Sequence, residues 1–323
     1  MASNEQRGKE ALSNLERELE SRDRKEKSRP WTVAALSLLV MVAIGGGIYF
    51  AATRGGEEDL TANETDAEIA TEEQPEENEE LDTSQYEAVA TTRATALPAT
   101  VSCTYDEEAA DSDEYSVGVP QTDDVSTEGT VNVELDTNQG PIGMELDRAV
   151  SPCTVNAIEY LALEGYFNDT VCHRLTTSAG LKVLQCGDPS GSGAGGPGFQ
   201  FPNEFPTDEA LEEAGDIDLE QFGLTEDATE EEKNMATSYA LQEKPMLYPR
   251  GSIAMANAGL GTNGSQFFLN YEDSVLPPLY TYFGQISDEG LDTLAKIAEK
   301  GVEDGAPDGA PADEVRIEKV TVK

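Results

Sequence analysis

Two runs of this sequence combine cationic, amide and apolar side chains of the kinds that line a binding or catalytic site. Residues 172–175 read Cys-His-Arg-Leu, and a loop separates them from residues 183–188, which read Val-Leu-Gln-Cys-Gly-Asp. Residues 251–258 read Gly-Ser-Ile-Ala-Met-Ala-Asn-Ala, and residues 262–268 continue with Thr-Asn-Gly-Ser-Gln-Phe-Phe.

Several common chemistries are excluded by the same residues. His173 is the only histidine and has no His or Cys partner at ligand spacing, so it predicts neither a metal site nor a Ser-His-Asp triad. Residues 191–198 are rich in glycine but lack the Gly-Lys-Ser/Thr ending of a phosphate-binding loop, and they predict a flexible turn. We interpret His173 as a structural neighbour of Arg174.

In their order and spacing these runs resemble the cyclophilins, over about residues 130–322. The family's His-Arg strand matches residues 173–174, and its Gln-x-Gly-Asp strand matches residues 185–188. Its Met-Ala-Asn-Ala and Thr-Asn-Gly-Ser-Gln-Phe-Phe run matches residues 255–268, and a later Tyr-Phe-Gly fits at residues 282–284. The resemblance implies peptidyl-prolyl cis-trans isomerase activity without a cofactor or a metal.

Such an activity needs a residue like Arg174. The X–Pro bond rotates over a barrier of about 18–20 kcal/mol, and unassisted rotation takes tens to hundreds of seconds. Twisting the bond returns a lone pair to the prolyl nitrogen, so a catalyst needs a donor aimed at that nitrogen and an apolar slot for the ring. The guanidinium of Arg174 presents N–H groups in a fixed fork, and the resemblance places the family's catalytic arginine here. A hydrogen bond that strengthens only in the twisted state lowers the barrier.

The resemblance also indicates which residues hold the substrate. Carried over from the family, Phe268 and Leu276 line the proline pocket, and one or two of Leu181, Val183 and Leu184 complete it. Taken alone, each of these residues is at least as well explained by core packing. The expected substrate-binding residues are His173, Val183, Gln185, Ala256, Asn257, Ala258, Gln266, Phe268, Leu276 and Tyr280.

The sequence departs from the best-known cyclophilins at the edges of this pocket. The loop between Arg174 and Gln185 is longer, Val275 occupies the place of a common Trp, and Tyr280 occupies the place of a common His. Similar Leu-Pro-Pro-x-Tyr sequences to that at residues 276–280 occur in bacterial-type members, so we expect activity to be kept.

The four cysteines suit a domain exported to an oxidising compartment. In the cyclophilin fold the strands that carry Cys172 and Cys186 are neighbours, so the resemblance predicts a disulfide between them. Cys103 and Cys153 then remain as the second predicted pair.

The elements that position these residues begin near residue 130. Apolar residues alternate on both sides of an Asn-Gln-Gly turn at residues 138–140, which predicts a β-hairpin. We expect a mainly β domain over residues 130–323, a closed eight-stranded antiparallel barrel with two capping helices, interrupted by an acidic and mostly exposed insertion at residues 207–249. Helices are predicted over residues 154–163 and about 288–300, and further strands at residues 171–175, 182–187, 252–257, 266–269, 280–286 and about 315–322.

The N-terminal part of the chain has a different composition. Residues 1–30 form a charged segment, and residues 31–50 carry no charge over a length that spans a bilayer. Basic residues before this span predict a cytoplasmic N-terminus. A cleaved signal peptide ending near Ala52 is the alternative. Residues 51–129 are acidic with little apolar periodicity and predict a disordered linker, within which Cys103 and Tyr105 are the candidates for the point where order begins.

The net charge of −43, from 64 acidic against 21 basic residues, excludes a general nucleic-acid binder. Solubility, a solvated tail or a salty exterior explains such acidity. We predict a monomer in the cell membrane, with one N-terminal transmembrane helix and an extracytoplasmic isomerase domain that acts on proline-containing exported polypeptides. A cell-surface binding or chaperone module that grips proline-containing segments without catalysis is the alternative.

Overall fold

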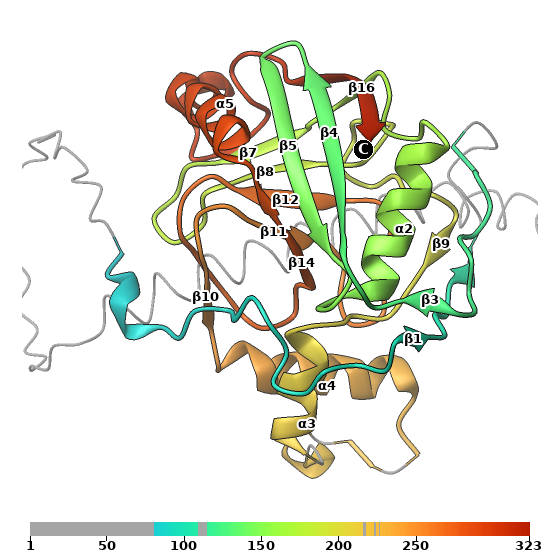
Figure 1. Cartoon of the computed structure of the whole chain (residues 1–323). Helices are drawn as coiled ribbons and strands as arrows, with labels where there is room; N and C mark the ends of the chain where they lie inside the picture. Colours follow the sequence, from blue (N-terminus) through green and yellow to red (C-terminus); the bar gives the residue numbers. More distant parts are fainter. Residues whose placement is uncertain (1–80, 109–114, 216–217, 223, 226) are drawn as a thin grey trace, which may run out of the picture. The chain divides into compact units, whose positions relative to one another are not determined.

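The computed structural model describes residues 81–108, 115–215, 218–222, 224–225 and 227–323 (Figure 1). Its centre is a curled ten-stranded sheet in which neighbouring strands are antiparallel. The spatial order is β15 (Asp308–Gly309), β7 (Arg174–Thr176), β8 (Val183–Cys186), β12 (Phe267–Asn270), β11 (Ser252–Met255), β14 (Tyr282–Ile286), β5 (Gly140–Asp147), β4 (Thr130–Thr137), β16 (Arg316–Val322) and β6 (Thr170–Val171). Within the described residues β15 and β6 do not pair, so the expected closure into an eight-stranded barrel is not confirmed.

The hairpin of β4 and β5 follows directly from the alternating sequence. Val133, Leu135 and Ile142 point into the core and are at most 2% exposed, while the residues between them face outward. The turn between the strands passes through Gly140, whose φ of 126° is disfavoured for other residue types. The predicted hairpin is therefore present, with the predicted face buried.

Two helices pack on this sheet, as predicted. Helix α2 (Pro152–Leu163) begins with a proline in its first turn and packs on β16 and β4. Helix α5 (Asp288–Lys300) begins at Ser287, whose hydroxyl accepts from the N–H of Gly290, and it packs on β5. Its buried face carries Leu291, Leu294 and Ile297.

The described residues of segment 81–128, called the N-terminal arm below, differ from the expected disordered linker. The arm carries the 3₁₀ helix η1 (Thr83–Gln85) and three short strands that pair with the domain or with each other. β1 (Thr100–Val101) pairs with β3 (Val125–Ser126), and β2 (Asp106–Glu107) pairs with β9 (Phe199–Gln200).

A few anchors hold the arm where a periodic pattern is lacking. Cys103 is disulfide-bonded to Cys153 at the start of α2, and Tyr105 donates its hydroxyl proton to the Cys153 carbonyl at 2.7 Å. Val89 is 3% exposed, and its N–H donates to the carbonyl of Leu247 at 2.8 Å. The arm is therefore held by one disulfide and a few buried side chains. It has no long run of periodic apolar residues, which is the signal by which sequence patterns detect ordered segments.

The acidic insertion at residues 207–249 folds mainly as helices. It contains α3 (Thr207–Ala214), the 3₁₀ helix η2 (Leu219–Phe222), α4 (Glu230–Gln242) and β10 (Met246–Tyr248). Leu241 and Tyr248 are fully buried and fix it to the domain, while much of its surface is exposed, as predicted. β10 continues into the domain by pairing with β13 (Ser274–Leu276).

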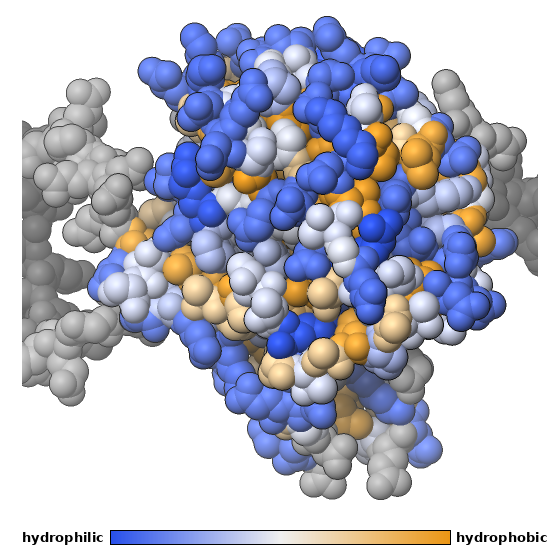
Figure 2. All heavy atoms as spheres, in the orientation of Figure 1, coloured by the Kyte–Doolittle hydropathy of each residue, from blue (hydrophilic) through white to orange (hydrophobic). Residues whose placement is uncertain are grey.

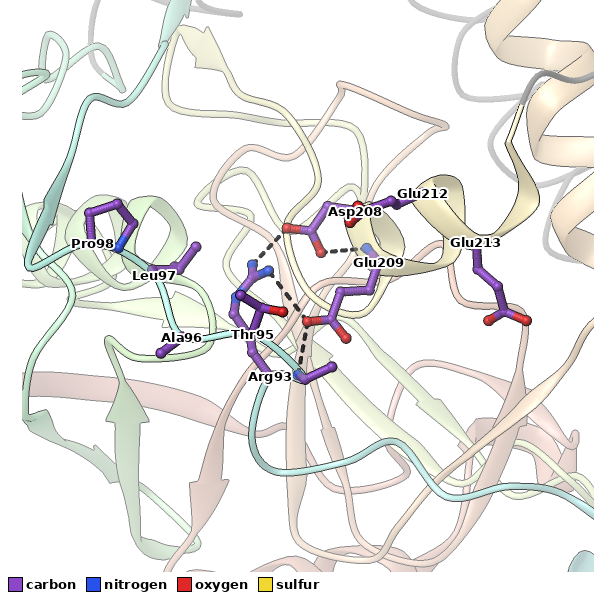
Figure 3. Close-up of a pocket in the computed structure, with 10 residues that line it drawn as sticks. Arg93, Thr95, Ala96, Leu97, Pro98, Asp208, Glu209, Glu212 and Glu213 are labelled. Carbon is purple, nitrogen blue, oxygen red and sulfur yellow. Dashed lines mark hydrogen bonds and ion pairs between the residues drawn. The ribbon is translucent and has the colours of Figure 1, made fainter.

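The arm clamps the insertion through Arg93 (Figure 3). Its Nη2 lies 2.7 Å from Asp208 Oδ2 on α3, its Nε donates to the carbonyl of Val150 at 2.8 Å, and its side chain is only 7% exposed. An open pocket of about 650 Å³ lies between the arm and α3, and none of the predicted site residues lines it.

The face of the domain shown in Figure 2 is dominated by hydrophilic side chains with scattered apolar ones. The predicted segment 1–30, the predicted membrane span 31–50 and residues 51–80 of the predicted linker lie outside the described residues. Within the described ranges, no helix has both the length and the apolar character that crossing a bilayer requires.

Candidate active site

Arg174 begins strand β7 and lies opposite Gln185 in the ladder with β8. Its Nη1 donates to Gln185 Oε1 at 3.2 Å, and Gln185 Nε2 donates to Gln266 Oε1 at 2.9 Å. Gln266 Nε2 in turn donates to the carbonyls of Gly193 and Gly195, each at 3.0 Å. Three residues predicted from separate sequence motifs thus form one continuous chain of hydrogen bonds.

The other edge of the guanidinium meets a carboxylate that the sequence did not indicate. Arg174 Nε and Nη2 each lie 2.7 Å from an oxygen of Asp308, a bidentate ion pair. Asp308 stands in β15, within an Asp-Gly-Ala-Pro stretch that sequence patterns classify only as a turn. Its distance of 134 residues from Arg174 leaves no local signal of the pairing.

A buried apolar cluster, called the slot below, lies beside the amide chain, because Phe268 pairs with Gln185 in the ladder of β12 and β8. Phe268 on β12 and Leu276 on β13 belong to one buried cluster with Val183 and Tyr280, and Leu181 packs against this cluster. The rings of Phe268 and Tyr280 meet edge to face, with centroids 5.6 Å apart. The structure therefore brings together the predicted proline-pocket residues. Leu184, the remaining sequence candidate, packs in the other, central core.

The side chain of Tyr280, which packs in this cluster, is uncharged. Burial raises the pKa of its hydroxyl to about 12, an effect that the nearby Arg174 guanidinium reduces. At physiological pH the ring therefore carries no charge and suits contact with a prolyl ring.

The loop after β11 binds its own side chains. Asn257 Nδ2 donates to Asn263 Oδ1 at 3.1 Å and to the carbonyl of Leu279 at 2.9 Å. The N–H of Ala258 donates to Thr262 Oγ1 at 2.8 Å. Ala256 belongs to the same buried cluster as Phe268 and Leu276, whereas the polar atoms of Asn257 and Ala258 make hydrogen bonds within the loop.

His173 supports the glycine-rich loop beside Arg174. An added Cβ on Gly193 would lie 3.3 Å from two atoms of its ring, which means that the loop backbone packs against the imidazole. Burial is the largest effect on its pKa and lowers it, and Arg174 adds to that shift while Asp188 opposes it. His173 is thus neutral at pH 7 and structural, and the described residues hold no cluster of His, Cys, Asp or Glu that fits a metal.

Asp188 holds the same glycine-rich loop through hydrogen bonds to its backbone. It is fully buried and accepts from the N–H of Ser190 at 2.8 Å and from the N–H of Gly193 at 2.6 Å. Burial by itself would raise its pKa, but the hydrogen bonds from Ser190, Gly195 and Gly193 outweigh burial and lower it. The loop that receives Gln266 is therefore rigidly held.

Both predicted disulfides are present in the structure. Cys172–Cys186 joins the residue that precedes His173 to the residue that follows Gln185, and Cys103–Cys153 joins the arm to α2. The first bond fastens the two segments that carry the arginine and its amide partner.

This fold and this site together define the cyclophilin class of proteins. The family model described as "Cyclophilin type peptidyl-prolyl cis-trans isomerase/CLD" matches residues 131–322, and the chain belongs to this family.

Two relatives that are nearly half identical to this chain come from mycobacteria. The chain is 49% identical over 205 residues to the probable peptidyl-prolyl cis-trans isomerase B of Mycobacterium tuberculosis, covering 63% of this chain and 58% of that protein. It is 48% identical over 221 residues to the probable isomerase B of Mycobacterium leprae, covering 68% and 66%. The chain thus spans less than two thirds of the length of these relatives.

A shorter relative is covered more fully. The match to a peptidyl-prolyl cis-trans isomerase of Helicobacter pylori is 35% identical over 172 residues and covers 52% of this chain and 80% of that protein. A crystal structure of a cyclophilin-type isomerase of Cryptosporidium parvum aligns with a TM-score of 0.43 at 25% identity, over 60% of this chain and 98% of that one.

Proposed function

We propose that this protein is a peptidyl-prolyl cis-trans isomerase that accelerates X–Pro rotation in exported polypeptides. The observation that carries the proposal is the placement of Arg174: its Nη1 is hydrogen-bonded to Gln185 at 3.2 Å, and the aromatic slot of Phe268 and Tyr280 lies beside this pair. Family membership of residues 131–322 supports the same activity.

The geometry suggests a mechanism in which the slot holds the prolyl ring while the rest of the peptide turns. As the amide twists, the prolyl nitrogen regains its lone pair and accepts a hydrogen bond from Arg174. A charge-assisted hydrogen bond made only in the twisted state contributes about 1.5–3 kcal/mol to lowering the barrier. Rotation about the X–Pro bond makes and breaks no covalent bond, so the step needs no proton transfer.

We also propose that residues 31–50 anchor the chain in the cell membrane, with the isomerase domain outside the cytoplasm and monomeric. Two disulfides among the described residues support an oxidising location. The uncharged length of residues 31–50 and the basic residues before it support the anchor and its orientation. Protease added to intact cells should degrade the domain from outside and spare residues 1–30. Full protection of the domain until the cells are lysed would contradict this orientation.

A protease-coupled assay tests the activity. The full-length chain, purified in mild detergent, is mixed with a proline tetrapeptide, and cis-to-trans conversion is timed for the wild type and for Arg174→Ala. We expect fast conversion by the wild type and a rate near the uncatalysed one for the variant. A folded wild type that binds the peptide without accelerating it would instead favour the non-catalytic binding module.

A further inference from the structure

The guanidinium of Arg174 is held from two sides by side chains on different strands. Asp308 accepts from Nε and Nη2 at 2.7 Å each, and Gln185 accepts from Nη1 at 3.2 Å. A bidentate carboxylate fixes both the plane of the guanidinium and its rotation within that plane. The Arg174 side chain is 17% exposed and that of Asp308 is 40% exposed, so the arginine is largely removed from water while the carboxylate keeps contact with solvent.

The backbone around Asp308 fixes the place of its carboxylate. β15 pairs with β7, so that Asp308 lies opposite Thr176, two residues along the same strand from Arg174. The N–H of Thr177 donates to the carbonyl of Pro307 at 2.8 Å, immediately before Asp308. Asp308 is therefore presented by a short strand of the sheet that carries the arginine.

The hydrogen-bond chain on the Gln185 side of Arg174 is also held in place. Gln185 passes its hydrogen bond to Gln266, and Gln266 donates to carbonyls of the glycine-rich loop that Asp188 holds. Among the described residues, Asp308 forms an ion pair with Arg174, with 2.7 Å between Nη2 and Oδ2. Asp308 consequently sets the orientation of the donor from the side away from the amides.

We propose that Asp308 is a positioning residue for isomerisation, which orients the Arg174 guanidinium so that its Nη1 side is presented beside the proline slot. This inference rests on the proposed function, because Asp308 acts only through Arg174. Without the carboxylate, the arginine keeps its charge but samples several rotamers, and only some of them aim a donor at the prolyl nitrogen. Removing the carboxylate should therefore lower the rate of X–Pro rotation on the enzyme and leave the affinity for the peptide unchanged.

Exchange NMR on a short X–Pro peptide tests the proposal, because it yields the peptide Kd and the rate of rotation on the enzyme separately. The full-length wild type is compared with Asp308→Asn, which keeps the shape and removes the charge, and with Asp308→Ala. We expect both variants to lower the on-enzyme rate about tenfold while Kd changes less than about twofold. In an Arg174→Ala background, Asp308→Asn should cause no further loss.

Glu159→Gln is the matched control, since it removes the carboxylate of the half-buried Arg148–Glu159 ion pair on α2, away from the slot. It should leave both quantities unchanged. Circular dichroism establishes that each variant is folded, and Asp308→Ala serves if Asp308→Asn is not.

Three results would overturn the proposal: an unchanged or faster rate in Asp308→Asn, an equal loss in the Arg174→Ala background, or a weakening of Kd that accounts for the lost rate. A wild type that does not accelerate rotation at all would instead overturn the proposed function, so the two failures are distinguishable.

Discussion

Arg174 and Gln185 lie directly opposite each other on adjacent strands, and their side chains meet at 3.2 Å between Nη1 and Oε1. Register therefore aligns a charged donor with the amide that orients it. A one-residue slip of β8 would turn Gln185 to the other face of the sheet, so the disulfide between Cys172 and Cys186 protects the site as well as the fold.

Replacing Gln185 by Leu should slow isomerisation because Arg174 and Gln266 both lose a hydrogen-bond partner. We expect kcat/KM to fall about tenfold, equivalent to roughly 1.4 kcal/mol. The protease-coupled assay measures this directly. A Gln185→Glu variant keeps an acceptor for Arg174 and should lose less, so equal losses in the two variants would show that this acceptor does not carry the effect. A Gln185→Leu variant as fast as the wild type would show that the amide chain is irrelevant.

Phe268 should contribute to peptide affinity beyond its contribution to stability. Phe268→Leu removes the edge-to-face contact with Tyr280 and the aromatic wall, and we expect roughly fivefold weaker peptide binding. Phe283→Leu is the matched control, because Phe283 is also buried but lies in the central core. Both variants should lose about 1 kcal/mol of unfolding free energy, and weaker binding by Phe283→Leu would contradict the assignment of the slot.

The arm should stabilise the insertion through Arg93. Arg93→Ala removes the ion pair with Asp208 and the hydrogen bond to Val150. We expect the free energy of unfolding to fall by about 2 kcal/mol. Hydrogen exchange of α3 should speed up. Arg250→Ala breaks a looser ion pair with Glu272 at 3.9 Å and should cost at most about 0.5 kcal/mol. Unchanged exchange in α3 would show that the arm does not clamp the insertion.

The two disulfides should differ in their contribution to stability. Cys103 and Cys153 are separated by 50 residues, and Cys172 and Cys186 by 14. Chain-entropy estimates give about 4 kcal/mol for the longer loop and about 3 kcal/mol for the shorter. Urea unfolding of the paired Cys→Ser variants, followed by circular dichroism, measures both losses. Free thiols in a non-reducing mass spectrum of the native protein would show that the two disulfides are not both formed, and the comparison would then not apply.

His173 should make the protein less stable as the pH falls. Burial lowers its pKa in the folded state, so the unfolded chain binds more protons below its ordinary value of about 6.5. The contribution of His173 to stability is therefore lost as pH falls from about 6.5 toward the lower folded pKa. Because this is the only histidine, the difference in Tm between the wild type and His173→Gln should shift against the wild type on acidification. A difference that is constant from pH 8 to 5 would refute the burial argument.

Local patterns predicted the parts of this fold that have strong periodicity. Val131 to Leu146 alternate through the hairpin and Leu291 to Ile297 recur at helical spacing, and both segments bury the expected face. The resemblance carried by the motifs brought Arg174, Gln185 and Phe268 to one site. The hairpin and the helix are confirmed because each depends on a short stretch of sequence, while the three motif residues lie close together and their roles stay a prediction.

The parts that were missed depend on long-range packing. The N-terminal arm is acidic, and its order rests on Cys103, Val89 and Arg93, each of which meets a partner far along the chain. Asp308 lies in a turn-like stretch, and only the pairing of β15 with β7 brings it to Arg174. The closed barrel is expected from many short strands together with two helices, and this pattern does not fix how the end strands meet.

The most direct test of the account is the rate of X–Pro rotation on the enzyme for Arg174→Ala, measured by exchange NMR together with the peptide Kd. Removing the donor while keeping the slot should reduce the on-enzyme rate about a hundredfold, with Kd changed less than about threefold. An Arg174→Ala protein that is folded, binds the peptide and turns it as fast as the wild type would contradict the central claim that this guanidinium stabilises the twisted amide.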